Sequence, residues 1–84
     1  MASFLLESYT PKREPAGLDE LIARAREGAE EAGREGIAVR HVRSFLAPDD
    51  DMCFHVFEAL SADAVARVSE LANLDHERIT EVIE

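Results

Sequence analysis

The spacing of hydrophobic residues changes several times along the chain. Residues 3–9 form a short segment rich in apolar and aromatic side chains that stops before Pro11, a residue without a backbone N–H, so the segment predicts a strand. Over residues 18–32 the apolar positions recur every three or four residues, the spacing of one face of a helix. This pattern predicts an amphipathic helix that ends near Gly33 and Gly36.

The second half of the chain repeats the change from strand to helix. Residues 37–47 and 52–58 are rich in β-formers and are separated by Pro48-Asp-Asp-Asp51, a turn sequence, so we expect a hairpin. Ser61 then suits a helix N-cap, and the apolar stripe after it predicts a second helix that stops near Asn73. Apolar β-formers within residues 79–83 indicate a closing strand.

The predicted order of elements is βαββαβ. This order is typical of the ferredoxin-like α+β fold, in which a four-stranded antiparallel sheet carries both helices on one face. The 84 residues suffice for one domain, so we expect a single ferredoxin-like domain over residues 1–84. Thr10 to Gly17 contains two prolines and predicts a loop. Gly28 lies beside the apolar stripe of the first helix, and we expect it to permit a close approach to the sheet.

Charge narrows the possible partners. The formal net charge is −9, which argues against nucleic acid and anionic membranes as partners and is compatible with a cation ligand. Cys53 is the single cysteine, so an intrachain disulfide is excluded. The first residues do not resemble a signal peptide, and no apolar run approaches the length of a membrane span. We therefore expect a cytoplasmic protein.

Alternation along the strands divides their side chains between two faces of the sheet. We assign the almost purely apolar set to the face that the helices cover: Phe4, Leu6, Val42, Leu46, Phe54, Val56, Ile79 and Ile83. The other set is chemically mixed and is expected on the open face: Glu7, Tyr9, His41, Arg43, Phe45, Cys53, His55, Phe57, Thr80 and Val82. Aromatic side chains on an uncovered face mark a contact surface, so we expect a homodimer that packs sheet against sheet.

Four side chains of the mixed set have the chemistry of metal ligands. In a ferredoxin-like sheet, Glu7, His41, Cys53 and His55 converge on one patch of the open face. Imidazole and thiolate groups bind divalent transition metals, and His55 is the strongest candidate of the four. Each residue also has a structural interpretation. His55 can fill a dimer interface, His41 can be a solvated edge residue, Cys53 can be a small buried hydrophobe, and Glu7 can pair with Arg43 on the same face.

Three segments together resemble the DUF4242 family. They are the strand His41-Val-Arg-Ser-Phe-Leu46, the acidic turn Asp49-Asp-Asp51 and the strand Cys53-Phe-His-Val-Phe-Glu-Ala59. The early Leu5-Leu6-Glu7 and the closing Arg78-Ile79-x-Glu81-Val82 also match, so the resemblance spans nearly the whole chain. It implies a ferredoxin-like dimer of the α/β-barrel type and a site for nickel or another divalent metal, without an established reaction. One departure is Asn73-Leu74-Asp75, with His76 beside it, where members carry Gly-Leu-Pro.

These observations leave three functions open. The first is a small dimeric nickel-binding or divalent-metal-binding protein that uses His55, Cys53, His41 and Glu7. The second is a dimeric small-ligand-binding protein or enzyme that uses the dimer cleft, by analogy of fold. The third is an interaction module that uses the open face for assembly. The sequence contains no glycine-rich phosphate loop, CxxC pair or HExxH motif, which argues against the enzyme classes that depend on them.

Overall fold

The computed structural model of the chain describes residues 1–10 and 17–84. The elements follow the predicted order: β1 (Ala2–Tyr9), α1 (Gly17–Arg34), β2 (Val39–Ala47), the short 3₁₀ helix η1 (Pro48–Asp50), β3 (Met52–Ala59), α2 (Ala62–Leu71) and β4 (Arg78–Val82). The ferredoxin-like prediction is therefore confirmed. Most of the predicted loop from Thr10 to Gly17 lies outside the described residues.

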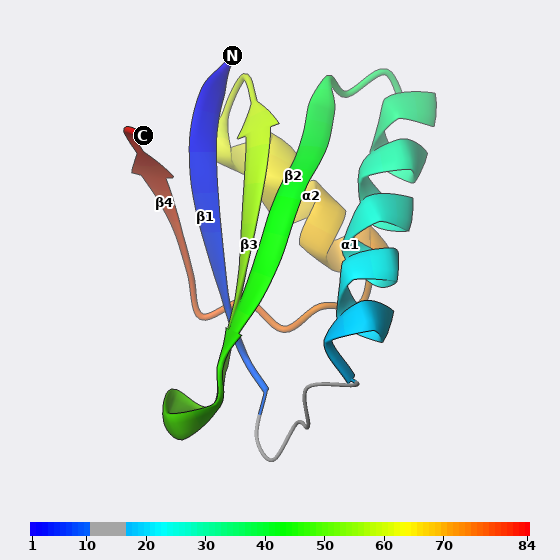
Figure 1. Cartoon of the computed structure of the whole chain (residues 1–84). Coiled ribbons are helices and arrows are strands. Elements are labelled where there is room, and N and C mark those ends of the chain that lie inside the picture. The colour runs from blue at the N-terminus through cyan, green and yellow to red at the C-terminus, as the bar shows by residue number, and fades with distance from the viewer. Residues whose placement is uncertain (11–16) are drawn as a thin grey trace.

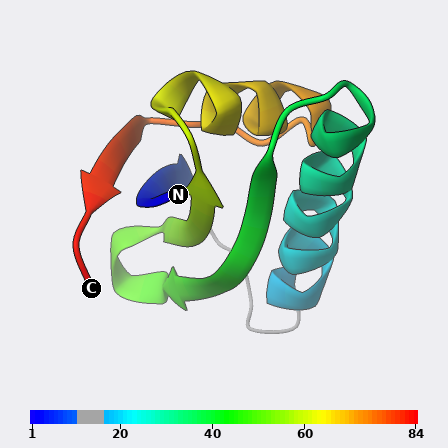
Figure 2. The ribbon, with the colours of Figure 1, turned by 90° about the horizontal axis from the view of Figure 1, so that it is seen from above.

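The four strands form one antiparallel sheet in the order β2-β3-β1-β4. Both helices pack on the same side of this sheet, with α1 running alongside the edge strand β2 and α2 behind the central strands (Figure 1). Figure 2 shows the same arrangement from above, with the sheet curled so that neither α1 nor α2 covers its other side. No helix of the described residues is long and apolar enough to cross a membrane.

Local sequence signals explain how the helices are placed. The Ser61 side chain accepts a hydrogen bond from the backbone N–H of Ala64 at 3.2 Å, which caps α2 as predicted. Gly28 does lie at a close approach, but its neighbour is α2 and not the sheet. A Cβ at Gly28 would lie 2.9 Å from the Cβ of Ala72 and 3.1 Å from the carbonyl oxygen of Val68. Glycine at this position thus sets the distance between the two helices.

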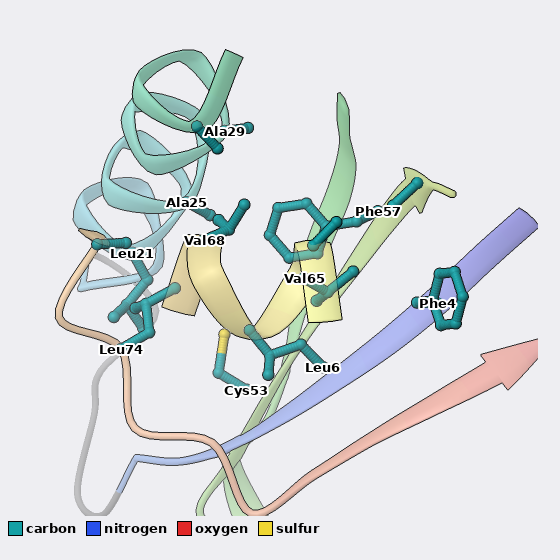
Figure 3. Close-up of a cluster of buried hydrophobic side chains, with 14 residues drawn as sticks. Phe4, Leu6, Leu21, Ala25, Ala29, Cys53, Phe57, Val65, Val68 and Leu74 are labelled. Atoms are coloured by element: carbon teal, nitrogen blue, oxygen red, sulfur yellow. The ribbon is translucent and has the colours of Figure 1, made fainter. Parts of the chain in front are cut away.

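The core lies between the helices and one face of the sheet. Figure 3 shows Leu6 and Cys53 from the strands pointing toward α2, with Phe57 beside Val68. All four of these side chains together with Val65 have less than 2 % of their surface exposed. Their burial identifies the helix-covered face of β1 and β3, because side chains on a strand alternate between faces.

The prediction for β3 was wrong about which face each side chain occupies. Cys53, His55 and Phe57 are fully buried on the helix-covered side, whereas Phe54 lies on the open face, stacked on Phe45 with ring centroids 5.2 Å apart. Pairing with β1 fixes this arrangement, since Phe57 pairs with Phe4. Both alternating sets of β3 contain aromatic and apolar residues, so hydrophobicity alone selected the wrong set.

A β-bulge changes the assignment of β2. The pairing with β3 shifts between His41 and Arg43, so that His41 lies opposite Phe57 while Arg43 lies opposite Val56. An irregularity of this kind breaks the alternation of side chains. His41 therefore shares the helix-covered side with Phe57, whereas Arg43 stays on the open face as predicted.

The predicted ion pair between Glu7 and Arg43 does not form. Glu7 instead pairs with Arg78 of the neighbouring strand β4, with Oε2 and Nε 3.1 Å apart. Arg43 pairs with Glu84 at the end of the chain. The strand order explains the exchange, because β4 is adjacent to β1 and β2 is separated from it by β3.

Candidate functional site

Four polar side chains form a hydrogen-bonded series through the interior beneath the helices, here called the buried polar chain: His41, Ser44, His55 and Cys53. The Ser44 hydroxyl lies between the two imidazoles, 2.8 Å from Nε2 of His41 and 2.5 Å from Nδ1 of His55. The other nitrogen of His55, Nε2, lies 3.5 Å from Sγ of Cys53. Two strands supply all four groups, because β2 carries His41 and Ser44 while β3 carries His55 and Cys53.

The buried polar chain runs from His41, which is partly accessible, to Cys53, which is buried in the core. His41 is half-buried, and its ring makes an edge contact with Phe57 at a centroid separation of 5.5 Å. His55 and Cys53 have no exposed surface. Ser44 lies directly opposite His55 across the β2–β3 pair, which is why its hydroxyl reaches Nδ1. The four groups thus lead from the edge of the sheet to the centre of the core.

Burial keeps both imidazoles neutral. It lowers the pKa of His55 from its ordinary value of 6.5 to about 4, with smaller electrostatic contributions from His41 and Arg24. Burial also lowers the pKa of His41, with a smaller contribution from Arg26. A neutral imidazole has one donor and one acceptor nitrogen. Near neutral pH, each ring can therefore accept at one nitrogen and donate at the other.

The single hydroxyl hydrogen of Ser44 restricts how these bonds are directed. If the hydroxyl donates to Nε2 of His41, it accepts from Nδ1–H of His55, and Nε2 of His55 is left to accept from the thiol of Cys53. If the hydroxyl donates to Nδ1 of His55, each bond reverses, and Nε2–H of His55 points to the sulfur. The direction of the Cys53–His55 hydrogen bond and the tautomer of His41 are therefore coupled through Ser44 and His55.

The series contains two donors with the spacing of adjacent metal ligands. Metal–sulfur and metal–nitrogen bonds of the usual lengths, at a tetrahedral angle, separate sulfur and nitrogen by about 3.6 Å. Cys53 Sγ and His55 Nε2 lie 3.5 Å apart. His41 Nε2 is directed to Ser44, and its ring centroid is 6.4 Å from that of His55. Among the described residues, no three His, Cys, Asp or Glu side chains are already arranged around a common metal position.

The four predicted ligands are only partly brought together. His41, His55 and Cys53 belong to one hydrogen-bonded series, whereas Glu7 pairs with Phe54 across the strands on the open face. The sheet separates Glu7 from the other three. Ser44 was missed by sequence reasoning, because its role depends on the bulge that sets His41 and Ser44 on the same face. The signal available in the sequence was one histidine on each strand of the predicted hairpin, His41 and His55.

His76, the third histidine, stays apart from this series. It is exposed, and its Nδ1 lies 2.9 Å from the hydroxyl of Ser69 on α2. Asn73, within the departure noted above, adopts a left-handed backbone conformation with φ of 54° just after α2. Asparagine tolerates this conformation better than most residues. The departure thus forms a turn that ends α2. His76, which follows it, does not belong to the buried polar chain.

The comparisons with known proteins give one family and one structure. Residues 4–82 match the family described as nickel-responsive protein SCO4226-like. The chain is also similar to the crystal structure of SCO4226 from Streptomyces coelicolor A3(2), with a TM-score of 0.77, 23 % sequence identity, and coverage of 99 % of this chain and 98 % of that one. No curated protein matches the sequence. Since the family match covers almost all of its residues, the chain belongs to the nickel-responsive SCO4226-like family.

Proposed function

We propose that this protein is a small nickel-binding protein, with Cys53 and His55 as its first two metal ligands. The observation that carries the proposal is the separation of 3.5 Å between Cys53 Sγ and His55 Nε2, which suits two ligands of one ion. The donor types also match the ligand preference of nickel, because thiolate and imidazole both bind nickel, zinc and copper. Membership of a family named for its response to nickel supports the choice of metal.

His41 is the third donor in this proposal. Its imidazole is linked to His55 through Ser44, so it belongs to the same hydrogen-bonded series as the two proposed ligands. The low pKa of His55, caused mainly by burial, favours the neutral imidazole that a metal requires. Glu7 is omitted from the ligand set, because it lies across the sheet and pairs with Arg78.

The proposal also includes a homodimer formed through the open face of the sheet. Tyr9 and Phe45 on this face have 49 % and 45 % of their surface exposed, and Phe54 stacks on Phe45. Exposed aromatic side chains of this kind favour a protein contact. The metal site and the dimer contact then occupy opposite faces of the sheet, so the dimer does not need the metal. Nickel binding without a catalysed reaction is the function that we infer.

Calorimetric titration of chelator-stripped protein with Ni²⁺, repeated with Zn²⁺, tests the proposal. We expect saturable binding near one ion per chain and a loss of at least about tenfold in affinity in His55→Gln. His76→Gln is the matched control, since it removes an exposed histidine outside the buried polar chain. Circular dichroism of each variant verifies that it is folded. The absence of saturable heat with both metals, or equal affinity in His55→Gln and the wild type, would overturn the proposal.

A further inference from the structure

A groove of about 360 Å³ lies between α1 and β2, and it is separate from the Cys53–His55 pair. We call it the α1–β2 groove. The last two turns of α1 form one wall and the beginning of β2 forms the other, where the two elements run side by side in Figures 1 and 2. Its volume falls within the range of small-ligand sites. Its lining consists of Arg26, Ala29, Glu30, Gly33, Val39, Arg40 and His41.

The groove combines apolar walls with a few polar groups. Ala29, Gly33 and Val39 supply surface without charge or side-chain hydrogen-bonding groups. Gly33 leaves real space, because a Cβ built there would have no atom within 4 Å. A ligand that fills this part of the groove therefore needs an apolar body.

Arg26 is the cation that the groove can offer to a ligand. Arg40 is committed to Glu58, with its Nη2 and Nε 2.6 and 3.1 Å from Oε1. The ion pairs within the described part of the chain do not include Arg26. Glu30 lies one helical turn from Arg26 and adds a carboxylate to the same lining. Because the whole chain carries a net charge of −9, an arginine in a groove that forms no ion pair with the described residues is a distinctive local feature.

His41 joins the groove to the interior. Its Nε2 is hydrogen-bonded to Ser44 at 2.8 Å, which leaves Nδ1 as the ring nitrogen for a ligand in the groove. In the tautomer that accepts a bond from Ser44, Nδ1 carries the hydrogen and donates. A carboxylate can then accept one bond from His41 and a charge-assisted bond from Arg26.

We propose that the α1–β2 groove binds a small organic monocarboxylate with an apolar body, held by the guanidinium of Arg26 and the imidazole of His41. The carboxylate matches the two donors, and the apolar body matches Ala29, Gly33 and Val39. A ligand that fixes the His41 tautomer also selects one hydrogen-bond direction in the buried polar chain. This proposal does not depend on metal binding.

A titration of the metal-free protein with benzoate, followed by two-dimensional amide NMR, tests the proposal. We expect saturable shifts at millimolar benzoate that centre on the groove residues. Arg26→Gln should weaken benzoate binding by about tenfold, since it removes a charged hydrogen-bond donor. Glu30→Gln should strengthen it, because it removes a carboxylate that repels the anion. Benzylamine, which has a similar ring and the opposite charge, should not bind.

Substitutions at Gly33 test the location without touching either donor. Gly33→Leu should occupy the open space and abolish benzoate binding, whereas Gly33→Ala should bind benzoate nearly as the wild type does. The amide spectrum of each variant verifies its fold. The proposal is overturned by an absence of saturable shifts with benzoate, by equal affinity in Arg26→Gln, by equal binding of benzylamine, or by undiminished binding in Gly33→Leu.

Discussion

The thiol of Cys53 and the imidazole of His55 lie 3.5 Å apart, and neither side chain has any exposed surface. Two residues apart on β3, they lie on the same side of the sheet, and both are buried beneath the helices. Polar groups are costly to bury unless they are hydrogen-bonded, and here Ser44 satisfies the second nitrogen of His55.

Stability should fall when the pH is lowered from 7 to 5. The unfolded His55 takes up a proton near pH 6.5, whereas the folded residue does so only near pH 4. The unfolded state therefore binds more protons in this range, and the free energy of unfolding decreases by about 2 kcal/mol at pH 5. Below pH 4 both states are protonated, so the loss from this residue stops growing. Urea unfolding at several pH values measures the effect.

The matched variants for this pH dependence are His55→Gln and His76→Gln. His55→Gln should flatten most of the decrease between pH 7 and 5, with a smaller remainder from His41, whose pKa is also lowered by burial. His76→Gln is the matched control, because it removes an exposed histidine outside the buried polar chain. An unchanged slope in His55→Gln would show that another group governs stability in this range.

Ser44→Ala should destabilise the protein and loosen the two histidines. The substitution removes the hydroxyl that lies 2.8 Å from His41 and 2.5 Å from His55, leaving the buried nitrogen of His55 without its partner. Loss of a partner by a buried polar group costs about 1–3 kcal/mol. Chemical denaturation gives the free energy, and imidazole ¹⁵N shifts report the tautomers. Unchanged tautomer populations in both rings would contradict the proposed coupling.

Alanine should have opposite effects at two glycines of α1. Gly28→Ala places a Cβ 2.9 Å from Ala72 and 3.1 Å from a backbone oxygen, so the two helices must move apart and stability should fall. Gly33→Ala meets no atom within 4 Å, so it should stabilise the helix by about 0.5–1 kcal/mol. Thermal unfolding of both variants compares them directly. Stabilisation by Gly28→Ala would show that the helices do not pack this closely.

The two faces of the sheet should respond differently to loss of an aromatic ring. Phe57 is fully buried, so Phe57→Ala should cost about 3–5 kcal/mol of the free energy of unfolding. Phe45 is 45 % exposed, so Phe45→Glu should leave the chain folded while weakening the proposed dimer. Light scattering after size exclusion measures the mass of this variant. A dimer that persists unchanged in Phe45→Glu would contradict the open face as the contact surface.

The strands and helices were predictable because the spacing of their hydrophobic residues is clear. The side of the sheet on which the side chains of β2 and β3 lie was not predictable in the same way. On β1 the alternation is unambiguous, and Phe4 and Leu6 are buried as expected. On β3, Phe54 and Phe57 are equally hydrophobic, so composition does not distinguish the face that the helices cover. On β2, the bulge after His41 breaks the alternation, and a single sequence gives no signal for it.

The candidate site was predictable by residue type and less so by position. His41, Cys53 and His55 were selected for their chemistry, and these three do lie in one hydrogen-bonded series with Ser44. Glu7 was expected on the same patch as these three residues, but it lies on the other face of the sheet and pairs with Arg78 of β4. The order of the strands determines that Arg78 lies beside Glu7 and Arg43 does not. The residue pattern within one strand carries no information about this order.

The measurement that tests the central claim most directly is the absorption spectrum of the protein titrated with Ni²⁺. Coordination by Cys53 as a thiolate should produce a sulfur-to-nickel charge-transfer band that saturates near one ion per chain. Cys53→Ser should abolish the band, and His55→Gln should weaken binding while the band remains at high nickel concentration. Nickel binding without this band, or with an identical band in Cys53→Ser, would contradict a site built on Cys53 and His55.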